Sequence, residues 1–267
     1  MYKINTERLI DIFLAVITAG TFLVLYMPIV VNSVFSLVPS DRKGIHWEEA
    51  SFEWYWRLFE NESVISAIKA TLLIGVIAVV IATFLAIILA LYVEWEGAVF
   101  RRTIELLVYF PFLMPPIITG LSLLMYFDRI GIPRGEITII IGHTALVLAV
   151  LYRLVLTRLR AMQYTLVEAS ADLGATRLQT FRYVVWPQLR PAVVTGSVLA
   201  MAISFDETLI TVFLAGDTTT IPLRLWGMMR VGFKPEINAL VTIVLLVSFI
   251  MAIIAAIRLK SPEGNEE

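Results

Sequence analysis

Two adjacent carboxylates, Asp206 and Glu207, interrupt a stretch of the chain that is otherwise apolar from Pro191 onward. If this stretch is helical, each residue adds about 1.5 Å, so Asp206 lies about 22 Å from Pro191 along the axis. That depth is within, or at the outer edge of, a membrane core about 30 Å thick. Because charged groups at such a depth are costly, they indicate a functional site by default. The carboxylates could compensate a cation in passage, relay protons, or pair with Arg224 or Arg230.

A second candidate is a polar segment, residues 165–187, in which turn chemistry and charge break a membrane-like sequence. Thr165 and Glu168 have the spacing of a capping box, so a short helix is predicted to begin at Thr165. Gly174 falls about two turns later, where a left-handed C-terminal cap is expected. Glu168 and Asp172, four residues apart, would give this helix an acidic stripe. Its apolar positions are Leu166, Ala169, Ala171 and Leu173. A helix this short is unstable alone, so it is expected to lie against its own protein or a partner.

A second helix is predicted after the glycine. Thr176 and Gln179 repeat the capping-box spacing, and Pro187 is expected to close the helix because proline has no amide donor. Helix, glycine turn, helix is also the outline of a DNA-binding helix-turn-helix, in which Arg177, Gln179 and Arg182 would lie on the recognition helix. Only about 38 residues separate the flanking apolar stretches, too few for a three-helix domain with its own core. A soluble DNA-binding domain is therefore disfavoured.

The residues of this segment resemble the signature loop of the membrane subunits of ABC importers. That signature is Glu-Ala-Ala, three residues, Gly, nine residues, then Ile-x-Leu-Pro, and the chain keeps both intervals from Glu168 through Gly174 to Pro187. It departs at Ser170, which is small, and at Val184 and Trp186, which are apolar, so docking is expected to survive. The resemblance implies a cytoplasmic coupling helix between spans 4 and 5, which inserts in a groove of a separate ATPase subunit. Its residues are Glu168, Ala169, Ser170, Asp172, Gly174 and Pro187.

The amino-acid composition indicates the class of protein to which these two candidate sites belong. Of the 267 residues, 59% are hydrophobic and 16% are charged, and the mean hydropathy is +0.84, whereas soluble domains are about 25% charged. The chain is therefore predicted to be an all-α integral membrane protein with a single transmembrane domain, residues 1–267. Six apolar runs predict six transmembrane helices. These are expected at about 10–38, 65–93, 104–127, 137–157, 191–214 and 237–258, with the coupling loop at about 158–190.

Two spans contain residues that are unusual in a membrane. Pro111, Pro115 and Pro116 are expected to break the hydrogen-bond ladder of the third span. The resulting kink could line a gate or serve only the packing between helices. His143 is a lone imidazole in the fourth span, where a satisfied hydrogen bond between helices is expected in preference to proton transfer.

The distribution of Lys and Arg predicts the orientation. For a chain whose N-terminus is inside, twelve of the 21 basic residues fall inside and nine outside. Six of the twelve lie between Arg153 and Arg190, which predicts that this loop and both termini are cytoplasmic. The first outside loop holds a cluster of rings at Trp47, Phe52, Trp54, Tyr55, Trp56 and Phe59. They predict either an interfacial helix that seats the protein in the bilayer or a landing surface for an extracellular binding protein.

A narrower resemblance rests on three stretches: 52–61, 204–216 and 221–240. They are similar to the second membrane subunit of spermidine/putrescine importers, the PotC type. The likeness extends from about Trp47 to Ile257. It implies the type I ABC importer permease fold and, as the solute, a polyamine, whose ammonium groups Asp206 and Glu207 would compensate.

The predicted function is that of a non-catalytic permease subunit of an ATP-driven importer in the cell's inner or plasma membrane. The sequence has no Gly-x-x-x-x-Gly-Lys-Ser/Thr phosphate loop, so no cofactor is expected in this chain and ATP with Mg²⁺ would bind another. The resemblance implies two copies of the ATPase subunit, a second similar permease and an extracytoplasmic solute-binding protein, without nucleic acid. No catalytic residue or metal ligand is assigned, and the absence of cysteine excludes disulfides and thiol chemistry.

Two alternatives stay open at this point. The importer could carry another small solute, or the chain could be a proton-coupled secondary transporter that uses Asp206 and Glu207 as a relay. That class often has inverted internal repeats, and no such repeat is visible in the sequence.

Overall fold

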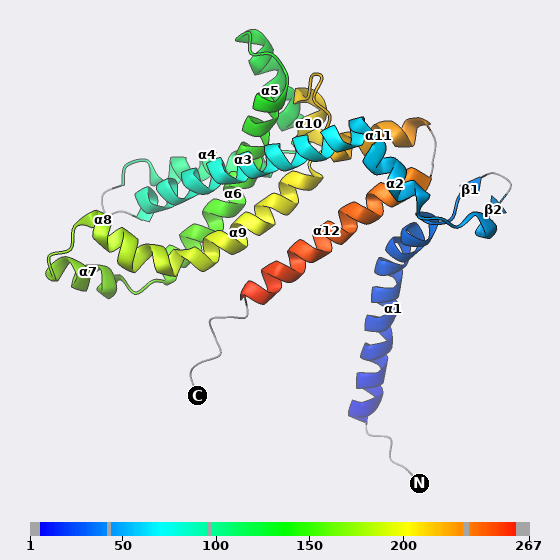
Figure 1. The fold of residues 1–267 in the computed structure, drawn as a ribbon. Helices are drawn as coiled ribbons and strands as arrows, with labels where there is room; N and C mark the ends of the chain where they lie inside the picture. The colour runs from blue at the N-terminus through cyan, green and yellow to red at the C-terminus, as the bar shows by residue number, and fades with distance from the viewer. Residues whose placement is uncertain (1–5, 42–43, 95–97, 232–234, 260–267) are drawn as a thin grey trace. The chain divides into compact units, whose positions relative to one another are not determined.

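The computed structural model describes residues 6–41, 44–94, 98–231 and 235–259. Apart from one short two-stranded ladder, every regular element in these residues is helical (Figure 1). The chain divides into two compact units, which are described separately. The first comprises Met1–Asn61 and Met228–Val247, and the second comprises Glu62–Gly227 and Ser248–Glu267.

The first unit begins with a long apolar helix. Its elements are α1 (Thr6–Phe35), β1 (Ser40–Asp41), β2 (Gly44–Ile45), the 3₁₀ helix η1 (Trp47–Glu49), α2 (Glu53–Glu60) and the first part of α12 (Pro235–Leu259). The side-chain amide of Asn32 donates to Asn238 O at 3.2 Å and to Thr242 Oγ1 at 3.1 Å. Asn238 in turn donates to Phe35 O at 3.3 Å. These bonds join the C-terminal end of α1 to the start of α12.

Helix α2 divides the predicted ring cluster into an inward and an outward part. The hydroxyls of Tyr55 and Ser36 lie 2.7 Å apart, which ties α2 to the end of α1. Phe52, Trp56 and Phe59 follow helical spacing and are 69%, 70% and 56% exposed. Either role predicted from the sequence, seating in the bilayer or contact with a binding protein, would use this outward face.

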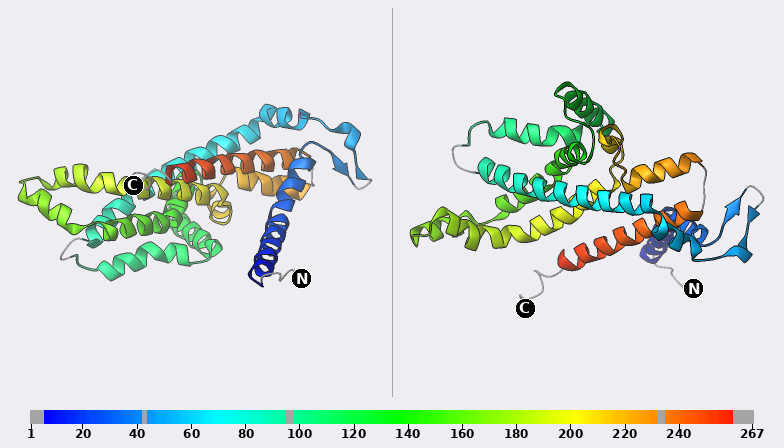
Figure 2. Two further views of the ribbon diagram at one scale, coloured as in Figure 1. Left: turned by 90° about the horizontal axis from the view of Figure 1, so that it is seen from below. Right: turned by 45° about the horizontal axis from the view of Figure 1, so that its top comes forward.

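The second unit carries both candidate sites. Its elements are α3 (Glu62–Glu94), α4 (Arg101–Leu113), α5 (Pro116–Arg129), α6 (Glu136–Ala161), α7 (Tyr164–Asp172), α8 (Arg177–Thr180), the π-helix η2 (Phe181–Val185), α9 (Trp186–Asp206), α10 (Leu209–Leu214) and most of α11 (Ile221–Val231). Helices α3, α6 and α9 pack against one another, and α10 packs against α5 and α6 (Figure 2).

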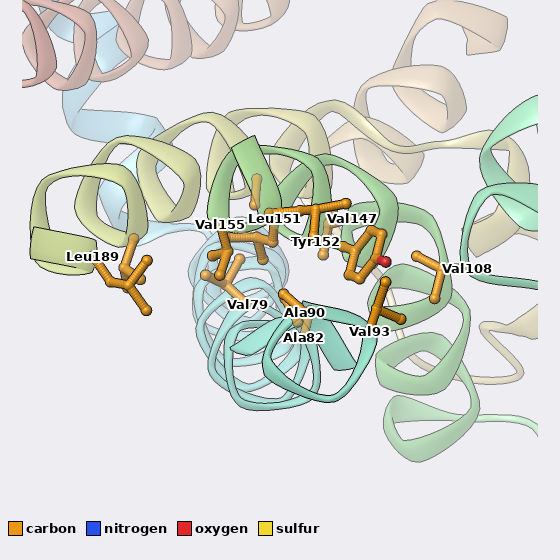
Figure 3. Close-up of a cluster of buried hydrophobic side chains, with 14 of the residues drawn as sticks. Val79, Ala82, Ala90, Val93, Val108, Val147, Leu151, Tyr152, Val155 and Leu189 are labelled. Atoms are coloured by element: carbon orange, nitrogen blue, oxygen red, sulfur yellow. The ribbon is translucent and has the colours of Figure 1, made fainter. Parts of the chain in front are cut away.

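The core of this unit lies between α3 and α6. Alanines at every fourth position give α3 a stripe of small residues that is fully buried: Ala78, Ala82, Ala86 and Ala90. Small residues let two helices approach closely, which is how helices associate where lipid removes the hydrophobic driving force. Larger side chains of α6 fill the space opposite (Figure 3); they include Val147, Leu151, Tyr152 and Val155. Helix α7 follows the end of α6 after two residues and packs against α8 and η2.

The apolar helices agree in position with the predicted spans. In the described residues four helices are long and apolar enough to cross a membrane: Arg8–Phe35, Glu62–Glu94, Glu136–Ala161 and Arg177–Asp206. The pair α4 and α5 counts as a fifth if it is one broken span, and α12 is apolar over Pro235–Ile250. Six separate spans therefore stay a prediction.

The break predicted in the third span is confirmed. Helix α4 ends at Leu113 and α5 begins at Pro116, with a bend of 106° between them. Met114 and Pro115 have extended ψ angles of 145° and 132°. Pro116 is the first residue of α5, where its missing amide costs no hydrogen bond. Pro111 lies inside α4, so the two later prolines mark the bend.

Candidate functional site

The C-terminal end of α7 has the glycine cap that the sequence predicts. Gly174 has φ +80°, in the left-handed region. Its amide donates to Ala171 O at 2.9 Å, and the amide of Ala175 donates to Ser170 O at 3.0 Å. This pair of bonds is a Schellman motif, which satisfies carbonyls at a helix end and turns the chain sharply. The predicted left-handed cap at Gly174 is therefore confirmed.

The second capping box is also confirmed. The hydroxyl of Thr176 accepts from the amide of Gln179 at 3.4 Å, and Gln179 Oε1 accepts from the amide of Thr176 at 2.8 Å. This reciprocal pair begins α8 at Arg177.

The prediction of a capping box at Thr165 and Glu168 is wrong. Helix α7 begins at Tyr164, with Gln163 as its N-cap and without a side-chain cap bond. Only Met162 and Gln163 leave the helical conformation between α6 and α7. Thr165 is therefore already inside the first turn, where its hydroxyl cannot cap the helix. Glu168, the predicted partner, is exposed.

The prediction that Pro187 closes the second helix is also wrong. Pro187 is the second residue of α9, and the π-helix Phe181–Val185 directly precedes it. A π turn shifts the hydrogen-bond ladder by one residue, so the ladder is rearranged just before the residue that has no amide to donate. The helix continues, and the connection between spans is shorter than the predicted 158–190.

Helix α7 presents acidic and apolar side chains together on its surface. Glu168, Ala169 and Asp172 are all exposed. Leu166 is 44% exposed and Leu173 is 89% exposed. A nine-residue helix is marginal without tertiary packing, and exposed leucines beside carboxylates are typical of a surface that a protein partner covers.

A smaller face of α7 turns inward. Val167 packs against the core between α3 and α6. Ser170 Oγ lies 2.8 Å from Thr180 Oγ1, which ties α7 to α8. The hydroxyl that distinguishes Ser170 from the alanine of the signature therefore has a structural role, and Ser170 does not belong to the exposed face.

Ion pairs join the ends of α3, α4 and α6, and a pocket lined in part by α7 lies beside them. Arg160, near the end of α6, bonds Glu94 of α3 at 2.8 Å and Glu105 of α4 at 3.1 Å. Exposed pairs contribute only about 0–1 kcal/mol each, so these bonds link the three helix ends at little gain in stability. A pocket of about 640 Å³ lies beside them, lined among others by Leu91, Leu159, Tyr164, Val167 and Phe181.

The fifth predicted span is not one continuous helix. Helix α9 ends at Asp206, Glu207 has an extended ψ of 110°, and α10 begins at Leu209. Glu207 Oε1 accepts from the amide of Ile210 at 2.8 Å. The carboxylate therefore caps the start of α10, as acidic side chains do at helix N-termini. The expected helix through 191–214 is corrected to two helices with an interruption at Glu207 and Thr208.

The two carboxylates have different environments. Asp206 is exposed, whereas Glu207 is half-buried. In the part of the second unit that the structure describes, no ion pair joins either one to Arg224, and Arg224 Nε is buried without a hydrogen bond. The alternative partner, Arg230, belongs to the other unit, so that pairing stays a prediction.

His143 contacts both helices that flank the interruption. Its ring is 2% exposed, with Nδ1 at 2.8 Å from Ser204 Oγ and Nε2 at 2.9 Å from Thr211 Oγ1. The predicted hydrogen bonding between helices is confirmed. The sequence did not predict that Ser204 and Thr211 are the partners. Their hydroxyls lie inside apolar stretches, which could have marked them as candidates.

Gly142 explains why α10 comes so close to α6. A Cβ at this position would lie 2.7 Å from Ile210 Cγ2 and 2.9 Å from Leu214 Cδ1. A larger residue there would require the side chains of Ile210 and Leu214 to shift.

The sequence and the fold together define the class of protein. The family model for the binding-protein-dependent transport system inner membrane component matches residues 82–259. This match covers more than half of the chain and includes both the α7 segment and the interruption at Glu207. The chain therefore belongs to this family, and it is an inner-membrane permease of an ABC importer.

Curated relatives narrow the comparison to one type of permease. The spermidine/putrescine transport system permease protein PotC of Escherichia coli (strain K12) is 32% identical over 233 residues, which cover 86% of this chain and 87% of that protein. The putrescine transport system permease protein PotI of the same strain is 32% identical over 235 residues, covering 84% and 82%. PotC of Haemophilus influenzae is 29% identical over 232 residues, covering 86% and 90%.

Solved structures show the same fold at lower identity. A bacterial ABC transporter involved in the import of the acidic polysaccharide alginate aligns with a TM-score of 0.75 at 17% identity, covering 97% of this chain and 98% of that chain. The alginate transporter in complex with its pentasaccharide-bound periplasmic protein gives 0.70 at 17% identity, covering 95% and 96%. The inward-facing MetNI methionine transporter gives 0.62 at 18% identity, covering 79% and 98%.

Proposed function

We propose that this permease imports a polyamine, spermidine or putrescine, and that α7 is the coupling helix through which a separate ATPase drives it. The observation that carries the coupling role is the exposed face of α7, where Glu168, Ala169 and Asp172 lie beside exposed leucines. The Schellman motif at Gly174 fixes the direction in which the chain leaves this face. A short helix held in a set orientation can transmit a movement of its partner to the helices on either side.

The proposed complex contains two copies of the ATPase, a second similar permease and an extracytoplasmic solute-binding protein. One of the alginate transporter structures includes a periplasmic protein, which supports the last of these partners by analogy. In this arrangement ATP with Mg²⁺ binds the ATPase, and the present chain holds no cofactor and performs no catalysis. The chain itself is a single transmembrane domain, residues 1–267, with six spans and a cytoplasmic coupling loop.

The solute is proposed from the relatives and from Asp206. PotC and PotI are named for spermidine and putrescine transport. Asp206 is exposed and makes no ion pair with Arg224 in the described part of the second unit, so its charge is available to a passing cation. At an effective dielectric constant of about 20, a carboxylate and an ammonium 4 Å apart attract by about 4 kcal/mol.

Copurification followed by ligand identification tests this assignment. Purified from its native membrane, the chain is expected to bring an ATPase, a second permease and a binding protein, and the binding protein is expected to hold a polyamine. An anionic or uncharged solute on that binding protein would contradict the polyamine assignment. Recovery without any ATPase would contradict the coupling role of α7.

Single cysteines test the proposed orientation. The variants Glu48→Cys, Ile130→Cys and Asp217→Cys are expected to react with an impermeant reagent on sealed cells, and Leu178→Cys only after permeabilisation. All four positions are exposed, and the chain has no cysteine of its own, so there is no background. Ile130 is preferred to its neighbour Gly131 because Gly131 has φ +75°, which a cysteine would strain. Labelling of Leu178→Cys alone would reverse the orientation.

A further inference from the structure

A directed chain of hydrogen bonds crosses the interruption between α9 and α10. The hydroxyl of Thr211 donates to Glu207 O at 2.8 Å. Thr211 Oγ1 also lies 2.9 Å from His143 Nε2, and the opposite ring nitrogen, Nδ1, lies 2.8 Å from Ser204 Oγ. Glu207 Oε1 closes the arrangement by accepting from the amide of Ile210.

The direction of this chain assigns the protons on the ring. A carbonyl oxygen can only accept, so the single hydroxyl proton of Thr211 is committed to Glu207 O. Thr211 Oγ1 must then accept from His143, which requires a proton on Nε2. A neutral imidazole carries one N–H, so Nδ1 is bare and accepts from the hydroxyl of Ser204.

A charged ring does not fit this site. An imidazolium would donate from both nitrogens, and the hydroxyl proton of Ser204 would lose its acceptor on the ring. In the described chain no carboxylate bonds to the ring, since Ser204 and Thr211 are its hydrogen-bond partners. A buried charge without a partner carries a large desolvation cost, and His143 is 2% exposed.

We propose that His143, held as the neutral Nε2–H tautomer, is the positioning residue that fixes the interruption directly after Asp206 and thereby sets the rate of solute passage. The proposal rests on the passage role of Asp206 in the proposed function. The two ring nitrogens of His143, on α6, bond one residue on each side of the interruption. Ser204 lies two residues before Asp206 on α9, and Thr211 lies on α10. Gly142, directly before His143, leaves the space that lets α10 reach the ring.

The tautomer can be measured without any mutation at the site. The chain has two histidines, so protein labelled with ¹⁵N-histidine gives only two sets of ring signals, and a His46→Gln sample identifies those of His143. At neutral pH we expect a bare Nδ1 and a protonated Nε2, which differ widely in ¹⁵N chemical shift. A protonated Nδ1, alone or together with Nε2, would overturn the proposal.

The positioning role is tested by a matched pair at Thr211. Thr211→Val keeps the shape of the side chain and removes its hydroxyl, whereas Thr211→Ser keeps the hydroxyl. In the reconstituted complex we expect Thr211→Val to shift the ¹⁵N signals of His143 and to lower the maximal rate of ¹⁴C-putrescine uptake about tenfold. The binding-protein concentration at half-maximal uptake should stay unchanged, and Thr211→Ser should restore both the signals and the rate. Uptake by Thr211→Val at the wild-type rate would overturn the positioning role.

If the polyamine assignment is wrong, the wild-type complex itself gives a different result from the one expected above. The wild-type complex would then take up no putrescine, while its binding protein, loaded as purified, would still stimulate ATP hydrolysis. In that case the Thr211 pair is compared by this stimulated hydrolysis, where the same tenfold difference is expected, and the tautomer is read from the wild type as before.

Discussion

Gly174→Val is expected to lower solute uptake and solute-stimulated ATP hydrolysis about tenfold, while the chain still inserts in the membrane. Gly174 has φ +80°, and a left-handed conformation costs a residue with a Cβ about 1–2 kcal/mol. Space is not the limit, since a Cβ at this position would meet nothing within 4 Å. The strain therefore acts on the Schellman motif itself. A cost of 1–2 kcal/mol changes a two-state population by about 5–30 fold. A helix of nine residues that packs only through the small face around Val167 has little to offset this cost.

Gly174→Asn is the matched control. Asparagine adopts the left-handed conformation more readily than other residues with a Cβ. This variant should therefore keep most of the activity, although it also adds a side chain at this position. Both variants are compared by uptake in proteoliposomes and by ATP hydrolysis, at equal amounts of inserted protein. Full transport by Gly174→Val would show that α7 does not need its cap to work, and the docking role would then be wrong.

Asp206→Asn is expected to lower polyamine uptake at least tenfold in a complex that still assembles. The amide keeps the size of the side chain and removes the charge, which an ammonium group needs in a medium of low dielectric constant. Solute affinity measured on the isolated binding protein must stay unchanged, because that site is on another chain. The loss should therefore appear in transport alone.

The two carboxylates should respond differently to neutralisation. Glu207→Gln retains an oxygen that can accept from the amide of Ile210, so the cap of α10 and most of the uptake should remain. Glu207→Leu removes the cap, which costs about 0.5–2 kcal/mol, and should lower thermal stability first. If Asp206 instead anchored Arg224, the double variant Asp206→Asn with Arg224→Gln would recover both stability and uptake. That recovery would contradict the passage role.

Local turn chemistry was predictable from the sequence where it depends on a few neighbouring residues. The left-handed cap at Gly174 and the capping box of Thr176 and Gln179 follow from side-chain type and spacing. The capping box at Thr165 failed because the start of α7 depends on where α6 ends. Only Met162 and Gln163 separate the two helices, so Thr165 falls inside the first turn of α7.

Contacts between distant segments were not predictable from the sequence alone. Depth and polarity marked Asp206 and Glu207 as a site, yet the sequence could not show that Glu207 caps α10 while Asp206 stays exposed. His143 was expected to find a partner on another helix, and it finds two, 61 and 68 residues away in the chain. The helix end predicted at Pro187 is wrong because the π-helix before this residue runs directly into α9.

Uptake by the reconstituted complex tests the central claim most directly. Proteoliposomes that contain the permease pair and the ATPase, with ATP inside and the loaded binding protein outside, are expected to accumulate labelled spermidine or putrescine. The uptake should require both ATP and the binding protein, and it should persist when an ionophore collapses the proton gradient. Uptake that continues without ATP and stops with the proton gradient would contradict the account, because Asp206 and Glu207 would then act in a proton-coupled transporter.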